Sequence, residues 1–204
     1  MSKIFCIGRN YTEHAKELNN AVPTQPVVFM KPHTALLKEN KSFFLPSFSN
    51  NIHHELEIVL KIGKNGKAIE QQFAHRYISE ITVGIDFTAR DLQDECKTKG
   101  LPWEIAKAFD HSAVVGDFMQ VSNFTDLQNL QFHLLLNGNQ QQNGNSSNVI
   151  FNFDFIIHYL SQFFTLQQGD LIFTGTPSGV GAVKIGDRLE GFLENQKLFD
   201  FKIE

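Results

Sequence analysis

The sequence is poor in several features that would assign a protein to a class at once. It has only two cysteines, Cys6 and Cys96, which lie far apart and form no CxxC pair. We therefore expect two reduced thiols and neither a disulfide framework nor a thiolate metal site. A catalytic cysteine is the alternative, but neither residue has neighbours that would activate a thiolate.

Long hydrophobic runs are also missing. No apolar stretch approaches the roughly 20 residues that a membrane-spanning helix needs. The first residues, Met1–Tyr11, lack the basic region and the apolar core of a secretory signal peptide. These absences predict a cytoplasmic protein that does not associate with a membrane.

Positive charge is not in excess. The chain has 18 Lys+Arg against 22 Asp+Glu, a formal net charge of −4, which argues against a general nucleic-acid binder. The hydrophobic fraction of 42% and the charged fraction of 20% are typical of a globular protein. A length of 204 residues suits one domain, which we expect to span residues 1–204.

Short apolar and β-branched runs between turn residues predict a strand-rich fold. These runs lie at residues 3–8, 27–30, 56–62, 81–86 and 171–173. A further run, Phe132–Leu136, precedes Asn137-Gly138, a dipeptide that favours a hairpin turn. We place the Gln/Asn-rich stretch Asn139–Asn145 at the tip of that hairpin. We expect an α+β fold that is rich in strands, with short helices at its periphery.

Two helices are expected from the sequence pattern. Thr12–Leu18 is long enough for about two turns of helix. The clearer helix begins near Asp154, which we interpret as its N-cap. Its apolar positions recur on one buried face: Ile156, Ile157, Leu160, Phe163 and Phe164.

Three carboxylates suggest a metal site. Glu55 and Glu57 are two residues apart in a predicted strand, so both side chains lie on one face. Asp86 ends the apolar run 81–85, where a lone carboxylate is unfavourable. Three oxygen ligands suit Mg²⁺, or Mn²⁺ or Ca²⁺, and leave positions for water and substrate. A solvent-exposed acidic face is the alternative for Glu55 and Glu57.

Polar residues that follow Asp86 could complete this site. If the segment after it is helical, Asp86, Arg90 and Gln93 share one face at i, i+4 and i+7. A solvated helix face with mixed charge is the alternative. Lys107 follows the mostly apolar segment 100–106, an unusual setting for a purely solvated lysine.

Several of these segments together resemble the fumarylacetoacetate hydrolase family. The matching blocks are Gly8-Arg9-Asn10-Tyr11, Lys31-Pro32, His53-His54-Glu55-Leu56-Glu57, Asp86-Phe87-Thr88-Ala89-Arg90-Asp91 with Gln93, Lys99-Gly100-Leu101-Pro102-Trp103 through Lys107, and Thr174-Gly175-Thr176-Pro177 with Gly179 and Gly181. They occur in order over essentially the whole chain. The sequence is most similar to the short single-domain acylpyruvase and oxaloacetate decarboxylase members.

The resemblance implies a mixed β-sandwich roll, usually a homodimer, that holds Mg²⁺ through Glu55, Glu57 and Asp86. It implies a small 2-oxo acid substrate and a metal-dependent hydrolase that cleaves acylpyruvates to a carboxylate and pyruvate, through a metal-stabilised pyruvate enolate. An oxaloacetate decarboxylase or tautomerase on the same site is the alternative. A non-catalytic binding protein that keeps the fold is the alternative from a different class.

The resemblance also implies roles for individual residues. Lys107 would add a second positive group beside the metal. His14 would be the general base and Glu17 its partner, on an N-terminal lid at about residues 10–20, whereas from spacing alone such a pair is more often a surface contact. His53 and His54 would support the strand. The remaining substrate-binding residues would be Arg9, Arg90, Gln93, Gly175 and Thr176.

Overall fold

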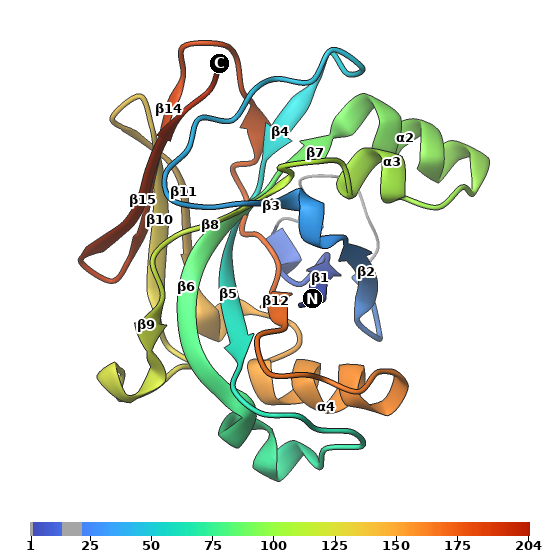
Figure 1. Cartoon of the computed structure of the whole chain (residues 1–204), viewed down its shortest axis with the longest axis vertical. Helices are drawn as coiled ribbons and strands as arrows, with labels where there is room; N and C mark the ends of the chain where they lie inside the picture. Colours follow the sequence, from blue (N-terminus) through green and yellow to red (C-terminus); the bar gives the residue numbers. More distant parts are fainter. Residues whose placement is uncertain (1, 14–21) are drawn as a thin grey trace.

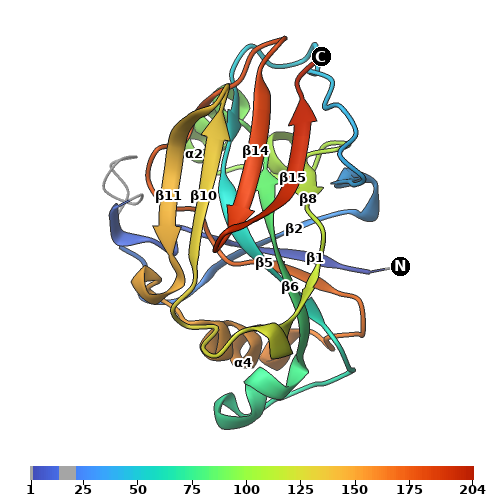
Figure 2. The ribbon, with the colours of Figure 1, turned by 90° about the vertical axis from the view of Figure 1, so that its left-hand side faces the viewer.

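The computed structural model describes residues 2–13 and 22–204, in which two curved β-sheets pack against each other with short helices around them. Figure 2 shows the smaller sheet lying across the strands β5 and β6 of the larger one. The strand-rich fold with peripheral helices confirms the fold class expected from the sequence. None of the helices in the described segments is long and apolar enough to cross a membrane.

The larger sheet has the strand order β2-β1-β12-β5-β6-β8-β3, and β9 also pairs with β6. Its strands are β1 (Ile4–Gly8), β2 (Val27–Lys31), β3 (Leu36–Leu37), β5 (Leu56–Ile62), β6 (Ile78–Asp86), β8 (Ala113–Val115), β9 (Met119–Gln120) and β12 (Leu171–Phe173). The long antiparallel pair β5–β6 lies at its centre. These two strands are buried on both faces, which explains why they appear in the sequence as continuous apolar runs.

Two smaller sheets complete the strands. The four-stranded sheet has the order β11-β10-β14-β15, formed by β10 (Gln131–Leu136), β11 (Asn139–Asn145), β14 (Arg188–Leu193) and β15 (Gln196–Lys202). The three-stranded sheet has the order β13-β4-β7, formed by β4 (Ile52–His54), β7 (Thr88–Ala89) and β13 (Gly181–Ala182). The latter sheet connects the start of β5 to the start of the helix that follows β7.

The described helices are short and lie at the edges of the sheets (Figure 1). The α-helices are α2 (Arg90–Lys99), α3 (Glu104–Lys107) and α4 (Phe153–Phe163), and the 3-10 helices are His33–Ala35, Gln71–Tyr77, Val121–Asn123 and Ser146–Asn148. The helix expected over Thr12–Leu18 falls mainly on residues outside the described part of the chain.

The hairpin after Phe132 is confirmed, but its tip is shorter than expected. Asn137 and Gly138 form the turn with φ of 53° and 80°, the left-handed region that these two residues tolerate. Asn139–Asn145, expected at the tip, is instead the strand β11, paired with β10 over its length. Polar composition misled the prediction because one face of this edge strand is solvated.

The interpretation of α4 was correct in position and wrong in two details. Asn152, rather than Asp154, caps the helix, because its side chain accepts a hydrogen bond from the Phe155 N–H. Phe163 is 61% exposed and therefore does not belong to the buried face, which Ile156, Ile157 and Leu160 form. In the segment after β6, the helix α2 begins only at Arg90, so Asp86 lies at the end of a strand and not on the helix.

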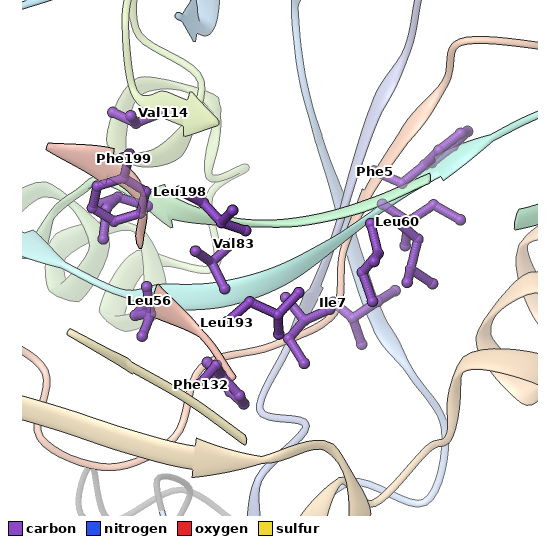
Figure 3. Close-up of a cluster of buried hydrophobic side chains, with 14 of the residues drawn as sticks. Phe5, Ile7, Leu56, Leu60, Val83, Val114, Phe132, Leu193, Leu198 and Phe199 are labelled. Carbon is purple, nitrogen blue, oxygen red and sulfur yellow. The ribbon is translucent and has the colours of Figure 1, made fainter. Parts of the chain in front are cut away.

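The main hydrophobic core fills the space between the larger sheet and the four-stranded sheet (Figure 3). Figure 3 shows that the four-stranded sheet faces the larger sheet through Phe132, Leu193 and Phe199, which lie opposite Leu56 and Val83. Gly84 lies in the middle of β6, where an added Cβ would be only 2.4 Å from the Val114 carbonyl oxygen. This close packing fixes the position of β6, and hence of Asp86 at its end.

Candidate active site

The three carboxylates of Glu55, Glu57 and Asp86 meet at one end of the β5–β6 pair. In the antiparallel register Glu57 faces Gly84, and the Asp86 N–H donates to the Glu55 carbonyl at 2.8 Å. The side chains are nearly inaccessible, with residue exposures of 5%, 3% and 0% for Glu55, Glu57 and Asp86. Their ligand oxygens lie within 4.8 Å of one another. The alternative of a solvent-exposed acidic face is therefore excluded.

Buried cations surround this carboxylate cluster. Lys107 Nζ lies 2.8 Å from Glu55 Oε2 and 2.7 Å from Asp86 Oδ2. Arg90 Nη2 lies 2.5 Å from the other oxygen of Glu55. Lys31 Nζ lies 2.8 Å from Asp86 Oδ1. Three positive groups thus contact two of the three carboxylates, Glu55 and Asp86, in a region from which water is largely excluded.

Glu57 differs from the other two carboxylates because no lysine or arginine within residues 2–13 and 22–204 forms an ion pair with it. Burial, and then the neighbouring Asp86 and Glu55 carboxylates, raise the pKa of Glu57 well above its usual value. For Lys107, burial alone would lower the pKa, but the adjacent Asp86 and Glu55 charges outweigh it and raise the pKa of this ammonium. The carboxylates therefore favour the charged form of Lys107 inside the site.

The donor set fits a hard divalent cation. All the candidate ligands are carboxylate oxygens, which Mg²⁺, Mn²⁺ and Ca²⁺ prefer, and none is a thiolate or an imidazole. A cation placed among them would also reduce the repulsion that acts on Glu57. Glu55, Glu57 and Asp86 are thus the residues that would hold a metal, and the identity of that metal stays a prediction.

Lys31 is a functional candidate whose role the sequence does not reveal. It ends β2, its side chain is 0% exposed, and it donates to Ser112 Oγ at 2.9 Å and to the Ser112 carbonyl at 3.1 Å. It also contacts the carbonyl oxygens of Lys107 and Phe87. Lys31 therefore anchors Asp86 and the backbone at Lys107 together. The sequence offers two signals for it, its position at the end of a predicted strand and the Lys31-Pro32 block of the family resemblance, but neither indicates this role.

Gln142 is a second residue that the sequence pattern did not single out. It projects from β11 into the interior, where its Oε1 accepts from the Leu56 N–H at 2.9 Å. Its Nε2 donates to Thr176 Oγ1 at 2.8 Å and to the Pro177 carbonyl at 3.0 Å. Gln142 thereby connects the smaller sheet to β5 and to the loop that carries Thr176.

The two histidines before Glu55 support the strand, as expected. Because Gln142 Oε1 is an acceptor, the contact of 2.9 Å from His54 Nδ1 places the proton on that nitrogen. His53 Nε2 lies 2.9 Å from Asn51 Oδ1. Burial, together with the charge of Arg90, lowers the pKa of His53 to about 4, so this ring is neutral near pH 7.

A small pocket opens over the carboxylate cluster. Besides the three carboxylates and Lys107, its lining includes Ile7, Arg9, Phe29, Arg90, Gln93, Lys97, Trp103 and Thr176. The structure thus brings Arg9, Arg90, Gln93 and Thr176 to one cavity, and their role in substrate binding stays a prediction. Arg90 Nη1 donates to Gln93 Oε1 at 2.6 Å, which fixes both side chains.

Gly175 contacts the carboxylate cluster through its backbone. Its N–H donates to Glu57 Oε2 at 2.6 Å and therefore holds a carboxylate of the cluster, and its role in substrate binding stays a prediction. Its φ is +106°, and a Cβ here would lie 2.6 Å from Asn10 Cβ, so only glycine fits. His14 and Glu17 lie outside the described residues, and their roles stay predictions.

Comparison with known proteins finds relatives over nearly the whole chain. Residues 3–200 match the family model described as fumarylacetoacetate (FAA) hydrolase C-terminal. The chain is 42% identical to oxaloacetate tautomerase FAHD1, mitochondrial, of Bos taurus, over 98% of this chain and 91% of the relative. It is 41% identical to oxaloacetate tautomerase YcgM of Escherichia coli K12, over 93% of this chain and 87% of the relative.

A solved structure gives the same result. The fumarylpyruvate hydrolase from Pseudomonas aeruginosa, crystallised in complex with Mn²⁺ and pyruvate, superposes with a TM-score of 0.94 and 35% identity. The match covers 100% of this chain and 89% of that one. Family model, sequence and structure all agree over nearly the full length. The chain therefore belongs to the fumarylacetoacetate hydrolase family.

Proposed function

We propose that this protein is an enzyme that uses a divalent cation, Mg²⁺ in the first place, to transform small 2-oxo acids. The observation that carries the proposal is the buried cluster of Glu55, Glu57 and Asp86, which lies at the base of a pocket and is contacted by Lys107. Burying three carboxylates costs free energy of folding, so their presence together indicates a function that needs them. The relatives named above as tautomerases and as a hydrolase support an enzymatic role.

The pocket residues suit a reaction in which negative charge develops on a 2-oxo group. A bound divalent cation would act as a Lewis acid there, which stabilises that charge. Lys107 adds a fixed positive charge beside it. Because Gln93 Oε1 already accepts from Arg90, the group that Gln93 offers to a substrate oxygen is its NH₂ donor. Trp103 and Phe29 close the pocket with apolar surface.

Two reactions fit this arrangement. The first is hydrolysis of acylpyruvates, in which the C–C bond between C3 and the acyl carbonyl carbon breaks and an enolate of pyruvate forms. It requires an activated water, the role that we predict for His14 with Glu17. The second is tautomerisation or decarboxylation of oxaloacetate, which passes through the same kind of enolate and requires no attacking water. The names of the bovine and E. coli relatives favour the second candidate.

Parallel assays separate the two reactions. The purified chain would be tested with acetylpyruvate and with oxaloacetate, each with Mg²⁺, with Mn²⁺ and after chelation. We expect turnover that requires the metal, and we expect H14A to lose hydrolysis of acetylpyruvate while turnover of oxaloacetate is less affected. Hydrolysis that survives H14A unchanged would contradict the proposed water activation. Calorimetry that detects no Mg²⁺ or Mn²⁺ binding would favour a non-catalytic role.

Assembly and location remain predictions of their own. A homodimer is expected from the family resemblance and can be measured by light scattering in solution. A cytoplasmic location is expected from the sequence, whereas the bovine relative is named as a mitochondrial protein. Imaging of a tagged full-length chain would distinguish the two locations.

A further inference from the structure

One face of α2 forms a wall of the pocket and carries three polar residues. Arg90, Gln93 and Lys97 follow one another at i, i+3 and i+7, and all three line the cavity. The rise of about 1.5 Å per residue separates the backbones of Arg90 and Lys97 by roughly 10 Å along the helix. Helical side chains lean toward the N-terminus, so the Lys97 side chain extends back toward Gln93.

Lys97 differs from Arg90 and Lys107, two other cations of the pocket, because nearby carboxylates hardly neutralise its charge. Arg90 and Lys107 contact carboxylates at 2.5–2.8 Å. The acidic partner of Lys97 is Asp94, at 3.7 Å and with a side chain that is 65% exposed, whereas the Lys97 side chain is only 26% exposed. An ion pair of that length at the surface contributes little. Burial, followed by repulsion from Arg90, lowers the pKa of Lys97.

Arg9 lines the same pocket and directly follows β1. Its backbone adopts φ = 60°, a left-handed conformation that is unfavourable for a residue with a long side chain. The positive charge of Arg9 also contributes to the lowered pKa of Lys97. No ion pair of Arg9 is formed within residues 2–13 and 22–204. The outer part of the pocket is thus positively charged.

The chemistry of this outer part selects the kind of group that can occupy it. An apolar acyl chain would remove water from two cations and return no interaction, which is costly. A carboxylate would accept charge-assisted hydrogen bonds from both. Within the proposed function, the 2-oxo acid end of the substrate lies at the carboxylate cluster, so the opposite end of a short substrate reaches Arg9 and Lys97.

We propose that Arg9 and Lys97 form a second anion subsite, which binds a carboxylate at the end of the substrate opposite to the 2-oxo acid group. The preferred substrates are then 2-oxo dicarboxylates, and acylpyruvates with an uncharged acyl group bind less well. This inference rests on the proposed function for the position of the 2-oxo acid group. Lys97 acts here as a specificity-determining residue.

Binding of two non-reacting acids tests the subsite independently of turnover. Malate and lactate share a 2-hydroxy acid group, and only malate has a second carboxylate. By calorimetry with Mg²⁺, we expect the wild-type chain to bind malate at least about tenfold more tightly than lactate. We expect K97M to remove most of that difference by weakening malate alone, and K97R to restore it.

K99M is the matched control, because Lys99 lies on the same helix, is 60% exposed and pairs with Glu95 at 2.5 Å. It removes the same charge outside the pocket and should leave both affinities unchanged. Equal affinity of the wild-type chain for malate and lactate would overturn the inference. So would a loss of malate binding in K99M as large as that in K97M, since the effect would then be general electrostatics.

Turnover separates failure of the subsite from failure of the proposed function. We expect K97M to raise the KM for oxaloacetate about tenfold and to change the KM for acetylpyruvate less than about twofold. A chain that turns over neither compound but still prefers malate would refute the proposed function and retain the anion subsite. A chain that turns over both compounds with the same KM values in K97M would refute the subsite alone.

Discussion

Replacing Lys31 with Met should destabilise the protein strongly, although the change nearly conserves the volume of the side chain. The Lys31 side chain is 0% exposed and its ammonium lies 2.8 Å from Asp86 Oδ1. The substitution leaves a buried carboxylate with Lys107 as its remaining cationic contact, at 2.7 Å from its other oxygen. It also removes the donor to the Ser112 carbonyl and hydroxyl.

The magnitude follows from these contacts. Removing one partner of a buried ion pair costs about 3–5 kcal/mol, because the other charge stays buried without that partner. Since Lys107 still contacts Asp86, we expect a cost at the lower end of this range. Methionine fills most of the space of the lysine stem, so loss of packing adds less than about 1.5 kcal/mol. Since a typical domain has a free energy of unfolding of about 5–15 kcal/mol, K31M should lower the urea midpoint markedly.

The measurement is urea unfolding of wild type, K31M, D86N and the double variant, all after metal chelation. If the cost in K31M arises from loss of the ion pair with Asp86, the double variant should be more stable than K31M. The coupling free energy between the two substitutions should then be about 2 kcal/mol or more. A destabilisation by K31M below about 1 kcal/mol would refute the reasoning, given the usual effect of an exposed pair. Additive effects would assign the loss to the Ser112 contacts instead.

Four further predictions concern the metal, the pH dependence of stability and the packing. E57Q keeps an oxygen for the Gly175 N–H but removes a carboxylate, so calorimetry should show a loss of Mg²⁺ affinity of more than about tenfold. Because the pKa of Glu57 is raised above its usual 4.5, the folded metal-free chain binds more protons than the unfolded one; its free energy of unfolding should fall as the pH rises above 4.5, and E57Q should flatten that slope. Mg²⁺ at a hundredfold excess over its Kd should stabilise the wild-type chain by about 2.7 kcal/mol, and an unchanged Tm after adding the metal would contradict the site. G84A should cost about 1–3 kcal/mol or more because its Cβ meets the Val114 carbonyl at 2.4 Å, whereas G138A, where the added Cβ has no neighbour within 4 Å among the described residues, should cost only the strain of φ = +80°, about 1 kcal/mol; equal losses would contradict this account of the packing.

Features that depend on neighbouring residues could be predicted from the sequence. The strand β5 was expected at Leu56–Ile62 and is found there, because continuous β-branched and apolar residues favour a buried strand whatever surrounds it. The turn at Asn137-Gly138 was also predicted correctly, because both residues tolerate positive φ whatever surrounds them. Alternation along a strand also placed Glu55 and Glu57 on one face.

Features that depend on contacts between distant segments could not be predicted from the sequence. Nothing in the sequence distinguishes Gln142 from the glutamines beside it, yet it is 1% exposed and bridges β5 to the Thr176 loop. The same polar composition led us to expect a hairpin tip where β11 forms. A strand with one solvated face resembles a loop until its partner strand is known.

The sequence by itself determined the chemistry of the site, because carboxylates, lysines and an arginine at these spacings are suited to a metal and an anionic substrate. Only the tertiary structure decided how they are arranged. The β5–β6 register places Asp86 next to Glu55. Lys31 reaches Asp86 from β2, the edge strand of the same sheet. Which cations are neutralised by carboxylates, and which remain for a substrate, is a property of distances between segments far apart in the chain.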